Sequence, residues 1–176
     1  HWGPKHRGTL RAQRCLAEAY SNTGERKKSE ELFLSGLETL RANFCRQGRL
    51  LLDYLWPLGW FYSLENPEKA ESYLKEDAEI AAQTQGEDSV QHQFALIGLQ
   101  RLYSGQKQWA KQADVEKRVF QFRMKNLGMR QPRTTGALAG LLHCLAVLGR
   151  ANEAEDYVRA ALTEFAKSPP QSQDEW

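Results

Sequence analysis

An internal repeat of about 42 residues constrains the fold of this chain more than any other feature. Four segments align, and one position recurs in them at spacings of 42, 41 and 42 residues; it holds Tyr20, Tyr62, Tyr103 and Leu145. A unit of this length is too small to bury its own apolar face, so neighbouring units must stack and cover one another. The repeat therefore predicts a stack of similar units rather than a domain built around one central core.

Each unit has the pattern of two helices joined by a short turn. Apolar residues recur at three and four positions, which is the helical period, and single Gly or Pro residues separate the runs. The alternation typical of β-strands does not occur in the sequence. The expected helices cover residues 9–22, 27–46, 49–64, 68–84, 88–104, 109–127, 133–148 and 151–167. The predicted fold class is therefore all-α, with eight helices in pairs. The repeat phasing places Gly105 in the turn of the third unit, and it predicts close contacts between helices at the small residues Ala17, Gly59 and Gly140.

The second repeat contains a motif with a known counterpart. Leu58, Gly59 and Tyr62 form the pattern L-G-x-x-Y, which resembles the core of the first helix of a tetratricopeptide repeat. The 42-residue period is longer than the usual tetratricopeptide unit and resembles the repeats of the kinesin light chain group. The resemblance covers residues 9–167 and implies a right-handed superhelix, an α-solenoid of about four helical hairpins. It divides the chain into a leader (1–8), four units (9–48, 49–87, 88–131 and 132–167) and a flexible tail (168–176).

The same resemblance implies a binding groove. In the tetratricopeptide family the first helices line the concave face, and residues around the small residue of the core motif point into it. Carried over by position, the implied groove residues are Arg11, Arg14, Glu18, Trp56, Trp60, Phe94, Ile97, Arg101 and His143. The centre is an aromatic pair at i and i+4 flanked by Arg14 and Arg101. Aromatic surface supplies burial and arginine grips carboxylates, so this arrangement suits an extended peptide with an apolar anchor and acidic residues.

The two tryptophans can also be interpreted as core residues. Both cannot easily point inward, because Leu58 and Phe61 already occupy the core side of the same helix. We therefore expect at least one of Trp56 and Trp60 to be exposed in the groove. Pro57 lies between them and lacks an N–H group, so it should bend this helix or start it afresh.

Several functional classes lack support in the sequence. The four histidines show no metal-ligand spacing, and no H-x-x-x-H, G-x-S-x-G or phosphate-binding glycine loop occurs. His143 and Cys144 are neighbours on a helix and point about 100° apart, which does not suit a nucleophile and its base. No catalytic activity, metal or cofactor is therefore expected. The uncharged run around the tryptophans is too short to span a bilayer, so no membrane segment is expected.

Charge and cysteine content add expectations about partners and location. The chain has 24 Lys and Arg against 22 Asp and Glu, so no overall attraction to nucleic acid follows, and nucleic-acid binding is not expected. Charge alternates in blocks, which favours ordered docking of neighbouring units or offers a basic strip within 101–133 to an acidic partner. Three cysteines without a C-x-x-C motif favour a reducing, cytoplasmic compartment. A first residue that is His rather than Met predicts a fragment or a processed piece.

Taken together, these features favour a non-enzymatic protein-interaction module that holds a peptide or a partner helix in its concave groove. The alternative is a ligand- or peptide-sensing regulatory domain of a larger signalling or transcription-regulating protein. The tail ends in Asp174, Glu175 and Trp176, and it resembles the tryptophan-acidic peptides recognised by kinesin light chains. One hypothesis is that this tail occupies the groove of its own or a neighbouring molecule and causes self-association; the other is that it has no role.

Overall fold

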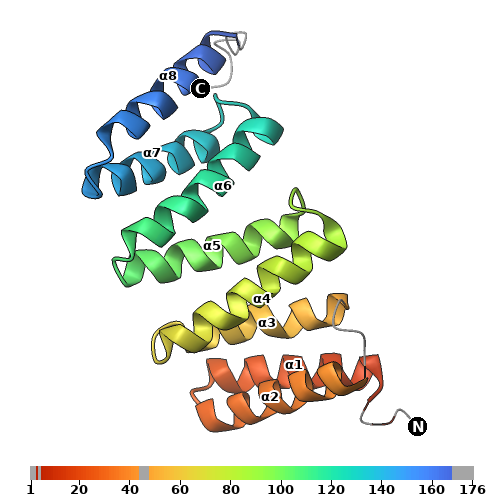
Figure 1. Ribbon diagram of the computed structural model, residues 1–176. Helices are drawn as coiled ribbons and strands as arrows, with labels where there is room; N and C mark the ends of the chain where they lie inside the picture. The colour runs from red at the N-terminus through yellow and green to blue at the C-terminus, as the bar shows by residue number, and fades with distance from the viewer. Residues whose placement is uncertain (1–2, 4, 44–47, 168–176) are drawn as a thin grey trace. The chain divides into compact units, whose positions relative to one another are not determined.

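All regular secondary structure that the structure describes is helical (Figure 1). The computed structural model describes residues 3, 5–43 and 48–167. Its helices are α1 (Arg7–Asn22), α2 (Arg26–Asn43), α3 (Arg49–Tyr62), α4 (Pro67–Gln85), α5 (Val90–Gly105), α6 (Trp109–Leu127), α7 (Pro132–Val147) and α8 (Ala151–Lys167). The predicted all-α fold of helical hairpins is confirmed.

The helix ends differ from the predicted ones by only a few residues. Helix α1 begins at Arg7, inside the segment that was expected to be a leader. Helix α3 continues through Pro57 without a break, so the prediction that this proline restarts the helix is wrong. The predicted end of the second helix at residue 46, and the expected flexible tail at 168–176, lie outside the described residues.

The chain divides into two compact units, residues 1–102 and 103–176. Unit 1 holds α1 to α4 and most of α5, and unit 2 holds α6 to α8. The division falls near the C-terminal end of α5, because Leu102 is the last residue of unit 1 and Tyr103 the first of unit 2.

Close contacts between helices hold the first half of unit 1 together. The Ser29 hydroxyl of α2 donates a buried hydrogen bond to the Ala17 carbonyl of α1 at 2.7 Å. The Tyr54 hydroxyl of α3 donates to the Leu10 carbonyl of α1 at 2.6 Å. Gly36 of α2 faces the Tyr54 ring, and a Cβ atom at this glycine would lie 2.4 Å from the ring atom Cε1. The predicted close contact at Ala17, which is fully buried, is confirmed.

A single leucine links the next three helices of unit 1. Leu74 of α4 is buried against Gly59 of α3 and Gly98 of α5, where an added Cβ would lie 2.5 and 2.8 Å from its side-chain atoms. The predicted close contact at Gly59 is therefore confirmed. Because one face of α4 packs on both α3 and α5, polar residues on that face are buried as well.

Unit 2 contains the third predicted close contact. Gly140 of α7 lies against the buried Glu116 of α6, and a Cβ at this glycine would lie 2.6 Å from Glu116 Oε1. The Phe120 ring of α6 and the Tyr157 ring of α8 pack edge to face with centroids 6.2 Å apart. A close glycine contact therefore joins α6 to α7, and an aromatic contact joins α6 to α8.

Most of the turns between helices contain one residue with a left-handed backbone conformation. Gly24, Gly86, Gly128 and Gly149 have positive φ angles between 69° and 90°. In the turn between α5 and α6 this conformation belongs to Lys107, with φ of 56°, rather than to the predicted turn residue Gly105. Gly105 is instead the last residue of α5.

Candidate functional site

Among the described residues of unit 1, three aromatic side chains are exposed, although large apolar side chains are usually buried. Trp56 is 37% exposed, Trp60 51% and Phe94 52%. The two indoles stack with centroids 6.3 Å apart and an interplanar angle of 9°. The other aromatic side chains of α3, on Tyr54, Phe61 and Tyr62, are buried, because they face the core. We call Trp56, Trp60 and Phe94 the aromatic surface.

A hollow of about 270 Å³ adjoins the aromatic surface. Three first helices of successive hairpins line it, and its residues are Arg14, Glu18, Leu52, Asp53, Trp56, Pro57, Gln91 and Phe94. Pro57 has no N–H group to donate to the carbonyl of Asp53, one helical turn earlier, and both residues line the hollow. The hollow therefore has apolar walls and polar side chains. It also lies beside the backbone carbonyl of Asp53, which lacks its usual hydrogen-bond donor within the helix.

The arginines predicted to flank the aromatic pair are arranged differently from each other. Arg14 forms an ion pair with Glu18 at 2.5 Å, with both side chains partly exposed. The Arg101 guanidinium lies over the Trp60 ring, 5.6 Å from its centroid. Because Arg101 has no carboxylate partner among the described residues, it is the better placed of the two to receive one from a bound molecule.

Three other predicted groove residues, Ile97, His143 and Arg11, are not among the residues that line the first hollow. Ile97 is half-buried on α5 and does not line the hollow. His143 is exposed on α7 in unit 2, where its ring packs edge to face on Trp109 at 5.5 Å. Since His143 belongs to the other unit, its place in a common groove with the aromatic surface stays a prediction. Arg11 is exposed and lines a different hollow from Arg14.

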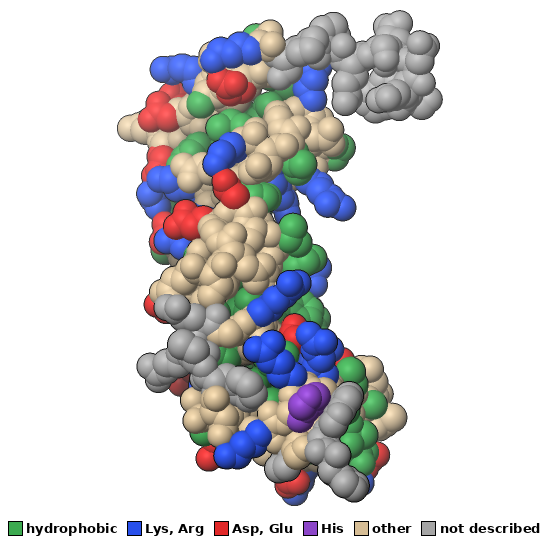
Figure 2. Space-filling view, turned by 90° about the vertical axis from the view of Figure 1, so that its right-hand side faces the viewer, with side chains coloured by type: hydrophobic (Ala, Val, Ile, Leu, Met, Phe, Trp, Pro, Cys, Tyr) green, Lys and Arg blue, Asp and Glu red, His purple; other side chains and the backbone are tan. Residues whose placement is uncertain are grey.

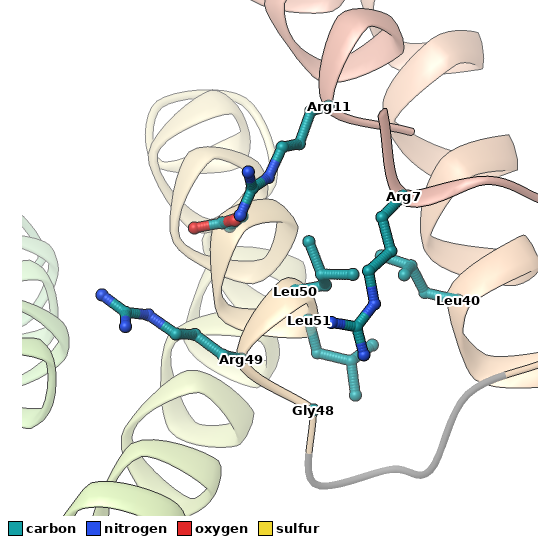
Figure 3. A pocket seen from close by; sticks show the side chains of 8 residues that line it. Arg7, Arg11, Leu40, Gly48, Arg49, Leu50 and Leu51 are labelled. Atoms are coloured by element: carbon teal, nitrogen blue, oxygen red, sulfur yellow. The ribbon is translucent and has the colours of Figure 1, made fainter. Parts of the chain in front are cut away.

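That second hollow, of about 250 Å³, has three arginines in its lining and a largely apolar wall (Figure 3). We call it the arginine hollow; its lining residues are Arg7, Arg11, Leu40, Gly48, Arg49, Leu50, Leu51 and Asp53. Figure 3 shows Arg7 and Arg11 extending from α1, with Arg7 reaching over the leucines, whereas Arg49 at the start of α3 points away from them. Figure 2 looks onto this end of α1 and α3 and shows Lys and Arg side chains gathered there beside apolar ones. Asp53 lines both hollows, so the two adjoin each other.

The repeat explains how these side chains come together. Arg7, Arg11, Arg14 and Glu18 of α1 are followed 42 residues later by Arg49, Asp53, Trp56 and Trp60 of α3. These positions are spaced by three or four residues, which places each set along one helix face. Sequence reasoning found the last three residues of the first set and the last two of the second, but it missed Arg7, Arg49 and Asp53. Extending the same spacing one or two turns toward the helix N-terminus would have found all three.

The buried carboxyl group of Asp77 interacts with two residues that line the first hollow. Asp77 of α4 is fully buried, and neither of its carboxyl oxygens has a hydrogen bond of normal geometry among the described residues. Burial raises the pKa of this carboxyl to about 7; a polar interaction with Gln91 opposes the rise, and the charges of Asp53 and Glu76 add to it. Asp77 is therefore an internal acid that titrates near neutral pH, next to two residues of the first hollow.

The neighbouring residues His143 and Cys144 do not form a nucleophile and base. Cys144 is fully buried, whereas His143 is exposed. Burial raises the pKa of the Cys144 thiol, and the charge of Glu116 adds to this effect. The thiol is therefore protonated and out of reach of a substrate.

No protein-family model matches the chain, and no curated protein matches its sequence. Solved structures do match. BtubC (BKLC) from P. vanneervenii has a TM-score of 0.70 and 20% sequence identity, over 96% of this chain and 70% of that one. Two structures of a Podosopora anserina kinesin light chain-like protein with nearly identical TPR-like repeats have TM-scores of 0.69 and 0.67. Their identities are 19% and 18%, over 97% and 98% of this chain and 80% and 81% of theirs.

This chain has a tetratricopeptide-like repeat fold. The predicted resemblance is thereby confirmed at the level of the fold, since these structures match over nearly the whole length of this chain. In a tetratricopeptide-like hairpin series, α1, α3 and α5 are the first helices, and most residues that line the two hollows lie on them.

Two further observations concern ligands and membranes. Within residues 3, 5–43 and 48–167, no group of three or more His, Cys, Asp or Glu could hold a metal ion. In the same residues, each helix is too short or too polar to cross a lipid bilayer.

Proposed function

We propose that this protein is an interaction module whose unit 1 binds an extended peptide segment of a partner protein on the first helices α1, α3 and α5. The peptide places an apolar side chain on the aromatic surface and an acidic side chain on Arg101. The single observation that carries the proposal is the stacked, half-exposed pair Trp56 and Trp60 beside a hollow. The tetratricopeptide-like fold supports a protein partner in general.

The physical basis is the energy that exposed aromatic side chains gain when a partner covers them. Trp and Arg are the residue types that contribute most to protein interfaces, because truncating them commonly costs at least about 2 kcal/mol of binding free energy. The stacked indoles restrict each other's rotation, so little side-chain entropy remains to be lost on binding. Arg101 is positioned by its contact with Trp60, so an acidic residue meets a guanidinium that is already oriented.

An array of synthetic peptides, each with one Trp or Leu and two acidic residues, tests the proposal. The best binder is measured by calorimetry against the full chain and against Trp60→Ala. We expect the substitution to weaken binding by at least about 2 kcal/mol, roughly thirtyfold, while changing stability little because the Trp60 side chain is half-exposed.

The matched control is Leu162→Ala, which removes an exposed apolar side chain from α8 in unit 2 and should leave affinity unchanged. Arg101→Gln should selectively weaken peptides that carry the acidic residues. Unaltered affinity in a folded Trp60→Ala protein would remove the aromatic surface from the binding site and refute the proposal.

A further inference from the structure

We propose that the arginine hollow binds the phosphate group of a phosphorylated residue in the same peptide that places its apolar anchor on the aromatic surface. This inference rests on the proposed function and specifies the class of peptide that unit 1 prefers. It is carried by three arginines that line one hollow and have no ion-pair partner among the described residues, by the adjacent N-terminus of α3, whose cap residue Gly48 provides no side-chain hydrogen bond, and by the continuity of this hollow with the aromatic surface.

Within the described residues, the charge of the arginine hollow is not neutralised. Arg7, Arg11 and Arg49 are exposed, and in this part of the chain none of them forms an ion pair. Among the described lining residues Asp53 is the one acidic residue, so these residues carry an excess of positive charge. Arg7 and Arg49 are also the first residues of α1 and α3, where the helix dipole disfavours a cation. A bound anion would relieve this repulsion, which gives binding an electrostatic driving force.

Backbone donors add to the arginines. The first amides of a helix have no acceptor within the helix. At α3 the cap residue Gly48 supplies no side-chain acceptor, and the first turn contains no acidic residue. Gly48, Arg49 and Leu50 all line the hollow, so this helix end faces the same space as the guanidinium groups. An oxyanion here would meet both guanidinium donors and the positive end of the α3 dipole.

The number of donors favours a phosphate over a carboxylate. A carboxylate has two oxygens and one charge, and Asp53 already supplies one such group to this hollow. A phosphorylated side chain has three acceptor oxygens and a charge of about −1.5 to −2 near pH 7, so it can engage several arginine forks at once. Nucleic acid would meet the same arginines, but its phosphates repeat along a chain. The leucines that line the hollow and the adjoining aromatic surface can bury apolar side chains, so they suit a peptide better than a nucleic acid.

The continuity of the two hollows sets the spacing of the expected motif. Arg49 precedes Trp56 by seven residues on α3, which corresponds to about 10 Å along the helix axis. An extended peptide advances by about 3.3 Å per residue. The phosphorylated residue should therefore lie about three positions from the apolar anchor. The peptide can run in either direction along the helix, so the phosphorylated residue can precede or follow the anchor.

The inference is tested with fluorescent peptides that carry one Trp anchor and a serine three residues before or after it, each with and without phosphate. Affinity for the full chain is measured by fluorescence anisotropy. We expect phosphorylation to tighten binding roughly tenfold in one of the two orientations. In Arg49→Gln and, independently, in Arg7→Gln, most of this phosphate-dependent gain should be lost. Both substituted side chains are exposed, so the variants should fold.

Arg118→Gln is the matched control, because it removes one exposed arginine from α6 in unit 2 and should keep the full gain. A gain below twofold in both orientations, or a gain that survives in both arginine variants, overturns the inference. Binding of a single-stranded RNA oligonucleotide that depends on Arg49, without any effect of peptide phosphorylation, overturns it as well.

The failure of the inference is distinguishable from the failure of the proposed function. If the unphosphorylated peptides bind in a Trp60-dependent manner and phosphate adds nothing, the peptide-binding function stands and the arginine hollow is not a phosphate site. If the phosphate gain depends on Arg49 but no binding depends on Trp60, the shared site is wrong and both proposals fail.

Discussion

Replacement of Asp77 by Asn should stabilise the protein and remove a large part of its pH dependence. Asp77 is fully buried on α4, and its carboxyl oxygens lack hydrogen bonds of normal geometry in the described part of the chain. Burial is the main reason why its pKa rises from 3.8 to about 7. The amide of Asn has nearly the same shape but carries no charge, so it isolates the effect of the ionised carboxylate.

The magnitude follows from the two pKa values. The folded state holds the proton of Asp77 up to about pH 7, whereas the unfolded chain releases it near pH 4. Between these values the folded state binds more protons, so the free energy of unfolding falls as the pH rises and becomes level above about pH 7. A shift of about three units corresponds to about 4 kcal/mol in total, of which about 2 to 3 kcal/mol falls between pH 5 and pH 8.

Urea denaturation followed by far-ultraviolet circular dichroism at pH 5 and pH 8 measures the effect. At pH 8 Asp77→Asn should raise the free energy of unfolding by about 1 to 3 kcal/mol, less than the full 4, because a buried amide also lacks partners. At pH 5 the gain should be small. Glu79→Gln, an exposed position on the same helix, is the control and should leave the pH dependence as it is in the parent chain.

The decisive quantity is the change in stability between pH 5 and pH 8, compared between the parent chain and Asp77→Asn. If the two proteins lose the same stability over this range, Asp77 does not titrate there. The reasoning from its burial would then be wrong, and water or a rearranged Gln91 must solvate the carboxyl.

Three other predictions concern packing and the tail. Ala17→Leu should lower the free energy of unfolding by about 1 to 3 kcal/mol, because Ala17 is fully buried where α2 crosses α1; an unchanged urea midpoint would contradict this contact. Tyr54→Phe should cost about 1 kcal/mol or somewhat more, since it leaves the Leu10 carbonyl without its buried donor, and the same melts measure it. A chain ending at Lys167 should bind a peptide with Trp next to acidic residues more tightly, or self-associate less, than the full chain; identical peptide affinity and identical sedimentation of the two chains would exclude a role for the tail.

Much of the fold could be predicted because the same helix–turn–helix pattern recurs four times in the sequence. The helical period and the turn residues gave the eight helices, and the small residue Gly59 gave the close contact with α4. The exposure of Trp56 and Trp60 was also predictable, because Leu58 and Phe61 occupy the buried side of the same helix. These features depend on residues a few positions apart, which share a helix face whatever the helix packs against.

The candidate site could be predicted only in part. Arg14, Glu18, Trp56 and Phe94 come together around one hollow, in line with what the resemblance to tetratricopeptide repeats implied. Arg11 instead lines the arginine hollow with Arg7 and Arg49, and sequence reasoning gave no sign of this. Whether an arginine meets a carboxylate, an indole or solvent depends on the neighbouring helix, so the different situations of Arg14 and Arg101 required the structure.

The sequence by itself determined the helices, their pairing into hairpins and the side of each helix that faces the core. Only the tertiary structure decided which polar residues are buried and which charges remain unpaired. Asp77 illustrates the difference, because it lies three residues after Leu74 on the face of α4 that packs on both α3 and α5. The second helix of a hairpin, such as α4, packs both on its own partner helix and on the first helix of the next hairpin. The environment of a charged side chain there is set by residues far away in the sequence, through contacts that local periodicity does not encode.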